Sequence, residues 1–215
     1  MNEVLDILKE IGRIAAYHGS SALSNFLGNK ILLSPSSADF ISIEEVPPNI
    51  HIDKVGVAIF YKINVGIRGD VVFILDERNA FKLIDLSKIK KEEERELSML
   101  TEMRELSVLT EMGVSIIKEI GHMVIGSYLT ALSLTLERMI VPPLPTFLSG
   151  TLKHIFLDFI FSPSVVEEAE KHRYFIQTLF ESPQEQIKGY LCLILPPKSV
   201  EEIKETFKGT LEKLE

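Results

Sequence analysis

The 215-residue chain is long enough to bury one sizeable core, and its formal net charge of -8 argues against a nucleic-acid-binding protein. Lysine and arginine are interspersed with acidic residues, so no basic stripe is available for a phosphate backbone, and we expect no nucleic-acid partner. The only cysteine, Cys192, lies in an apolar run, which excludes an internal disulfide framework and is typical of a cytoplasmic protein.

The N-terminal segment predicts neither a signal peptide nor a membrane anchor. The first ten residues mix charged and apolar side chains and lack a basic start followed by a continuous apolar stretch. The longest stretch of low charge, residues 123–136, is shorter than the roughly 20 residues that span a bilayer. We therefore expect a cytoplasmic protein without membrane insertion.

Periodicity and turn residues predict the elements of the first half of the chain. These are a long helix over 2–27, a short strand over 30–33, a hairpin with strands over 55–65 and 71–75, and a surface helix over 77–86. Gly28 stands where helices commonly stop, and Pro35 is expected to end the short strand.

The second half repeats this order of elements. The predicted elements are a helix over 114–136, a short strand over 139–141, strands over 174–180 and 189–195, and a closing helix over 199–211. The sequence of residues 8–13 returns 109 positions later as residues 117–122, and residues 69–75 align with 189–195. Residues 149–161, with apolar positions at helical spacing, form an insertion peculiar to the second half.

This repetition predicts a single domain, residues 1–215, built from two half-repeats. The first half-repeat is residues 1–87 and the second is residues 113–215, and a connector helix over residues 88–112 joins them. One domain is favoured over two because 215 residues can share one core.

The connector contains a tandem duplication, since residues 95–103 and 104–112 are identical at eight of nine positions. Nine helical residues rotate by about 900°, a net half-turn, so duplicated residues would face opposite sides of the helix. One hypothesis is that this helix projects and packs on a second protomer, giving a homodimer, or on another partner. The alternative is a neutral duplication in an exposed connector.

Both predicted long helices carry a polar stripe with the same spacing. The positions are Asp6, Glu10 and Arg13 on the first helix, and Ser115, Glu119 and His122 on the second. Spacings of four and three residues place each set on one helix face. Taken alone, such a stripe usually means a solvated ion pair of little energetic weight.

The stripes resemble the signature of the CheC, CheX and FliY family of chemotaxis phosphatases, which is Asp/Ser-x-x-x-Glu-x-x-Asn followed by a distant proline. Pro35 follows Arg13 by 22 residues, and prolines flank the corresponding position in the second copy. Residues 126–133 and the Gly69-Asp70 pair are also similar to CheC. The resemblance covers residues 5–211 except the duplication, and implies an α+β pseudo-twofold fold with two long helices on a mainly antiparallel sheet.

The resemblance also implies a function. CheC-type proteins bind the phosphorylated response regulator CheY and speed hydrolysis of its aspartyl phosphate. Glu10 and Glu119 match the family glutamate that contacts the regulator, and Asp6 and Ser115 match the binding position that opens the signature. The Mg²⁺ ion would belong to CheY, so we expect no cofactor and no metal site in this chain.

The family asparagine, which orients the attacking water, is replaced in both copies. Arginine offers only hydrogen-bond donors, so Arg13 predicts an inactive first site or a binding contact. Neutral histidine has one donor and one acceptor nitrogen, so His122 is the better candidate for hydrolysis. The alternative is a catalytically silent paralogue that binds CheY, CheD or the motor switch. The stretch that resembles the CheD-binding helix, near Leu148-Ser149, lacks the family Asp.

Overall fold

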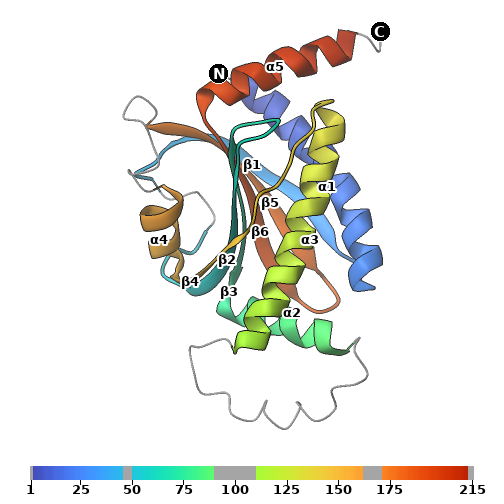
Figure 1. The fold of residues 1–215 in the computed structure, drawn as a ribbon, viewed down its shortest axis with the longest axis vertical. Coiled ribbons are helices and arrows are strands. Elements are labelled where there is room, and N and C mark those ends of the chain that lie inside the picture. Colours follow the sequence, from blue (N-terminus) through green and yellow to red (C-terminus); the bar gives the residue numbers. More distant parts are fainter. Residues whose placement is uncertain (1, 46–49, 90–109, 162–170, 213–215) are drawn as a thin grey trace.

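The computed structural model describes residues 2–45, 50–89, 110–161 and 171–212. Two long helices, α1 (Asn2–Leu27) and α3 (Glu111–Thr135), pack against each other and against one face of a six-stranded sheet (Figure 1). The predicted α+β fold, with two long helices on an antiparallel sheet, is confirmed. Gly28 ends α1 with a φ of 60°, a conformation that glycine adopts without strain.

The sheet has a symmetric strand order. Its strands are β1 (Leu32–Ser42), β2 (Val55–Ile63), β3 (Gly69–Asp76), β4 (Thr146–Thr151), β5 (His172–Ser182) and β6 (Ile187–Leu195). Their order is β1-β5-β6-β3-β2-β4, and every neighbouring pair is antiparallel. Exchanging β1 with β4, β2 with β5 and β3 with β6 gives the same order from the opposite edge, as a pseudo-twofold axis requires.

Three shorter helical segments complete the described fold. Helices α2 (Glu77–Ile89) and α5 (Pro197–Glu212) close the two halves, and α4 (Leu152–His154) continues as a π-helical turn, η2 (Ile155–Ile160). The α4 segment lies across the sheet from α1 and α3 (Figure 1). Within the described parts of the chain, no helix is both long enough and apolar enough for a membrane crossing.

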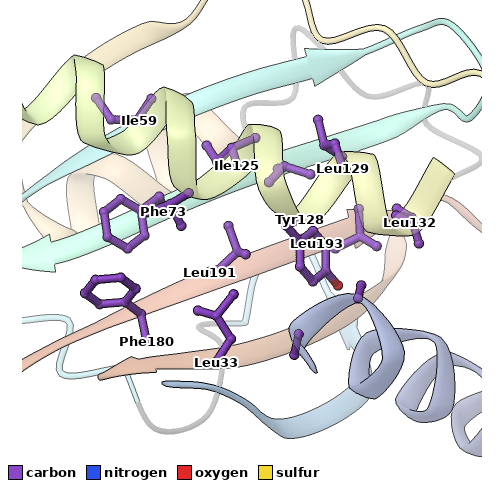
Figure 2. Packing of buried hydrophobic residues seen from close by; sticks show 14 of the residues in the cluster. Leu33, Ile59, Phe73, Ile125, Tyr128, Leu129, Leu132, Phe180, Leu191 and Leu193 are labelled. Atoms are coloured by element: carbon purple, nitrogen blue, oxygen red, sulfur yellow. The ribbon is translucent and has the colours of Figure 1, made fainter. Parts of the chain in front are cut away.

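The core consists of two apolar clusters, one on each face of the sheet. The larger lies between the sheet and α1 and α3, where Phe73 and Phe180 make an edge-to-face contact with ring centres 5.2 Å apart (Figure 2). Tyr128 of α3 is fully buried in this layer, and the smaller cluster lies beneath α4 and η2. Because the inward faces of both long helices are buried, their outward faces carry the polar stripes.

Two predicted strand boundaries are wrong, and both lie beside prolines. The strand expected to end at Pro35 continues to Ser42 with a register shift between Pro35 and Ser37. A proline is tolerated there because β1 is an edge strand. The strand expected over 139–141 does not form, and β4 begins at Thr146 instead. Prolines at 142, 143 and 145 cannot donate the hydrogen bonds that a strand needs.

The connector prediction falls mainly outside the described residues. Residues 90–109 are not described, so neither the helix over 88–112 nor its homodimer contact is tested. The structure resumes at Thr110, whose hydroxyl oxygen accepts a hydrogen bond of 3.2 Å from the N–H of Gly113. This cap begins α3 at Glu111, three residues before the predicted start.

Candidate functional site

In the first stripe, on α1, two of the polar residues form an ion pair with each other. The guanidinium of Arg13 donates two hydrogen bonds to the carboxylate of Glu10, 2.9 Å from Nε to Oε2 and 2.6 Å from Nη2 to Oε1. The hydrogen bond from Arg13 lowers the pKa of Glu10, so this carboxylate is ionised at neutral pH. The side chains of Glu10, Arg13 and Asp6 are all accessible to solvent. A partner that binds the Glu10 carboxylate must compete with Arg13 for it.

The second stripe, on α3, has a different arrangement. His122 does not contact Glu119, and its Nδ1 instead lies 2.6 Å from the hydroxyl oxygen of Tyr61 on β2. Tyr61 is fully buried, and burial raises its pKa to about 12, so the hydroxyl is neutral. The imidazole of His122 is nevertheless exposed, so one ring nitrogen is anchored to the sheet while the rest of the ring faces outward.

A close approach of α3 to the sheet brings these two side chains together. A Cβ added at Gly121 would lie 2.5 Å from Cγ1 of Ile59, so the absence of a side chain lets the helix rest on β2. Figure 2 shows Ile59 beneath this helix. Tyr61 follows Ile59 by two residues and therefore points to the same face of the sheet, under His122.

The first site has the corresponding helix contact but no counterpart of Tyr61. A Cβ at Gly12 would meet Cγ2 of Ile176 at 3.2 Å, a looser version of the contact at Gly121. Two residues after Ile176 stands Thr178, which is buried and makes no hydrogen bond to Arg13 within the described structure. Arg13 is bonded to Glu10 on its own helix, whereas His122 is bonded to Tyr61 of the sheet.

Glu119, unlike Glu10, is not engaged by another side chain of its stripe. Its side chain and that of Ser115 are exposed, and within the described residues neither has a hydrogen bond or an ion pair. The adjacent Lys118 places its Nζ 5.8 Å from the centre of the Phe147 ring on β4, rather than beside Glu119. An approaching cationic or hydrogen-bond-donating group therefore meets a carboxylate without a competing partner.

The structure keeps the two stripes apart instead of uniting them in one site. Helices α1 and α3 run in opposite directions (Figure 1) and approach closely at Gly19, where an added Cβ would lie 3.9 Å from the backbone nitrogen of Tyr128. Arg13 and His122 each precede this point by six residues, which is about 9 Å along a helix axis. The sites therefore lie on opposite sides of the crossing and can act separately.

Comparison with known proteins finds relatives of the kind that the stripes indicated. No protein-family model matches the chain. The CheY-P phosphatase CheC of Bacillus subtilis (strain 168) is 26% identical over 204 residues, which cover 94% of this chain and 92% of that protein. The resemblance to the CheC, CheX and FliY family is confirmed. The similarity to CheC thus covers nearly the whole chain.

Solved structures show that the fold is shared as well. FliY of Thermotoga maritima superposes with a TM-score of 0.72 at 21% identity, covering 97% of this chain and 98% of FliY. The FliM middle domain of Vibrio alginolyticus gives a TM-score of 0.61 at 16% identity, covering 93% of this chain and 99% of that domain. The arrangement of the helices and the sheet is therefore shared with these two structures.

The sequence pattern located the CheC-like stripes but missed Tyr61. A tyrosine within an apolar strand carries no signal of its own, and only the strand register places it beneath His122. The stretch at Leu148-Ser149 lies in edge strand β4 rather than in a helix, and CheD binding there stays a prediction. No group of three or more metal-ligating side chains is found among the residues described.

Proposed function

We propose that this CheC-like chain is a chemotaxis protein that binds a phosphorylated CheY-like response regulator through α3 and promotes hydrolysis of its aspartyl phosphate. The observation that carries the proposal is the joint exposure of Glu119 and His122 on one face of α3, one turn apart. The identity of 26% with the CheY-P phosphatase CheC over 94% of the chain supports it.

The proposed roles follow from what such a partner supplies. A phosphoaspartate beside Mg²⁺ already has an electrophilic phosphorus and neutralised charge, so hydrolysis needs chiefly a positioned water and a docked partner. Glu119 supplies the unpaired carboxylate that docks the regulator, Ser115 extends the contact, and His122 enters toward the phosphoryl group. The Mg²⁺ ion and the phosphorylated aspartate belong to the regulator.

The first site acts as a binding contact in this proposal. Arg13 has only donors, so it can bind anionic oxygens but cannot accept a proton from water. Its bidentate bond to Glu10 also occupies the carboxylate that matches the family glutamate. Asp6, one turn earlier and exposed, remains available to a docked partner.

A second candidate function is a catalytically silent module that binds CheY, CheD or the motor switch. Two observations favour it. Both family asparagines are replaced, by Arg13 and His122. In the first site, the ion pair with Arg13 also occupies the carboxylate of Glu10. The FliM-like fold is equally suited to binding without catalysis.

Decay of a radiolabelled, phosphorylated CheY-like regulator separates the two functions. We expect the natural protein to accelerate the decay, Glu119→Ala to weaken the acceleration through docking, and His122→Ala to abolish it at saturating protein. His122→Asn, which restores the family residue, should match or exceed the natural protein. If the natural protein binds the regulator without accelerating decay while His122→Asn accelerates it, the chain is a silent module and the hydrolysis proposal is wrong.

A further inference from the structure

The bond between Tyr61 and His122 determines which ring nitrogen of the histidine faces a partner. The hydroxyl oxygen and Nδ1 are 2.6 Å apart, Tyr61 has no solvent exposure, and the imidazole is exposed. Because Nδ1 is engaged by the sheet, only Nε2 is left to meet another molecule. The proton on the ring therefore decides whether the site offers a donor or an acceptor.

The burial of Tyr61 selects one of the two arrangements. If the hydroxyl accepted a hydrogen bond from Nδ1–H, its own proton would need a second acceptor. Within the described residues His122 is the only hydrogen-bonding partner of Tyr61. An unpaired buried donor carries a desolvation penalty that the opposite arrangement avoids. The hydroxyl therefore donates to Nδ1, and the neutral ring carries its proton on Nε2.

We infer that Tyr61 is a positioning residue that fixes His122 as an outward Nε2–H donor for an anionic oxygen, such as a phosphoryl oxygen, of the docked partner. The inference rests on the proposed function of the α3 stripe and specifies its chemistry. An asparagine amide presents both a donor and an acceptor, whereas His122 held in this way presents a donor alone. His122 is thus better suited to donate a hydrogen bond to a phosphoryl oxygen than to accept a proton from water.

This arrangement is found only at the second site, where Tyr61 on β2 supports His122 on α3. At the first site the position that corresponds to Tyr61 is Thr178 on β5, and Arg13 is held by Glu10 instead. Both sites therefore present N–H donors outward, although by different means. Arg13 does so through a guanidinium fixed on its own helix, and His122 through a ring fixed from the sheet.

The tautomer can be measured directly by ¹⁵N NMR of the histidine rings in the whole protein at pH 8, where an imidazole is ordinarily neutral. We expect a protonated Nε2 and an unprotonated, hydrogen-bonded Nδ1 for His122. Tyr61→Phe should convert this signature to a mixture of both tautomers. Tyr174→Phe is the matched control, because Tyr174 also packs against the helix-side core and should leave the signature unchanged. A protonated Nδ1 in the natural protein, or an unchanged signature in Tyr61→Phe, would overturn the inference.

Binding separates this inference from the proposed function. With a beryllofluoride-activated CheY-like regulator as the probe, we expect Tyr61→Phe to weaken affinity about two- to fivefold, because the donor loses its fixed orientation. An unchanged affinity overturns the role assigned to Tyr61. If the natural protein does not bind the regulator at all, the proposed function fails, while the NMR signature still decides the tautomer. Thermal unfolding of each variant verifies that it is folded.

Discussion

Substitution of Gly121 by alanine should separate α3 from the sheet and disturb the second site from a distance. The added Cβ would lie 2.5 Å from Cγ1 and 3.0 Å from Cβ of Ile59. Carbon atoms in contact are ordinarily about 3.5–4.0 Å apart, so the distance between α3 and Ile59 must increase by about 1 Å. A change of rotamer cannot relieve the contact with Cβ of Ile59, because that atom is fixed by the backbone. The helix itself must therefore move, and His122 moves with it.

The expected loss of stability follows from two opposing effects. Overpacking of this kind lowers the free energy of unfolding by about 3 kcal/mol at the upper end of its usual range. Replacing glycine by alanine within a helix raises it by about 1 kcal/mol. We expect Gly121→Ala to lower the free energy of unfolding by about 2 kcal/mol, which corresponds to a decrease in Tm of about 4–8 °C for a chain of this size. The 2.6 Å bond between Tyr61 and His122 should also be lost.

Urea unfolding of three glycine variants tests this reasoning. Gly126 lies in the same helix with no atom within 4 Å of an added Cβ, so Gly126→Ala should gain up to about 1 kcal/mol. Gly12→Ala, with its nearest contact at 3.2 Å, should lie between the two. If Gly121→Ala is as stable as Gly126→Ala, the helix does not depend on this close approach and the account of how His122 reaches Tyr61 is refuted.

Three further predictions concern other parts of the fold. Asp76 accepts a hydrogen bond of 2.9 Å from the N–H of Asn79 at the start of α2, so Asp76→Ala should lower the free energy of unfolding by about 1 kcal/mol in urea titrations, and Asp76→Asn, which can still cap, by less. Burial raises the pKa of Asp70 to about 6 from an unfolded value of 3.8, so its contribution to stability is complete below pH 3.8 and is lost as the pH rises through 6. The stability of Asp70→Asn relative to the natural protein should therefore increase by up to about 3 kcal/mol between pH 4 and pH 7.5, and a difference independent of pH would contradict the raised pKa. Arg13→Gln should leave the urea midpoint unchanged within error because its ion pair with Glu10 is exposed, and a clear shift would show that the pair is not simply solvated.

The elements that the sequence predicted well are those whose pattern is local. Residues 2–27 and 77–86 show helical periodicity, and each forms a helix within three residues of the predicted ends. The boundary that failed at Pro35 depends on the neighbouring strands. Pro35 fits inside β1 because that strand lies at the edge of the sheet, a position that only the assembled sheet defines.

The site shows the same division between local and non-local information. Glu119 and His122 were predicted to share an exposed helix face, because their spacing of three residues fixes that geometry. Which ring nitrogen of His122 is engaged by the protein could not be predicted from this spacing. Tyr61 is 61 residues away in the chain, and its contact with His122 depends on a helix-to-sheet distance set by Gly121.

The strand order has a consequence for how the chain is made. Edge strand β1 pairs with β5, which ends at Ser182, and β2 pairs with β4, so each half gives its first strand to the other. During synthesis the N-terminal edge strand therefore has no partner until most of the chain has emerged. Pairings this distant in sequence close slowly and leave strand edges exposed in the interim. Because each half-repeat lacks a partner for its own first strand, we expect that neither would fold without the other.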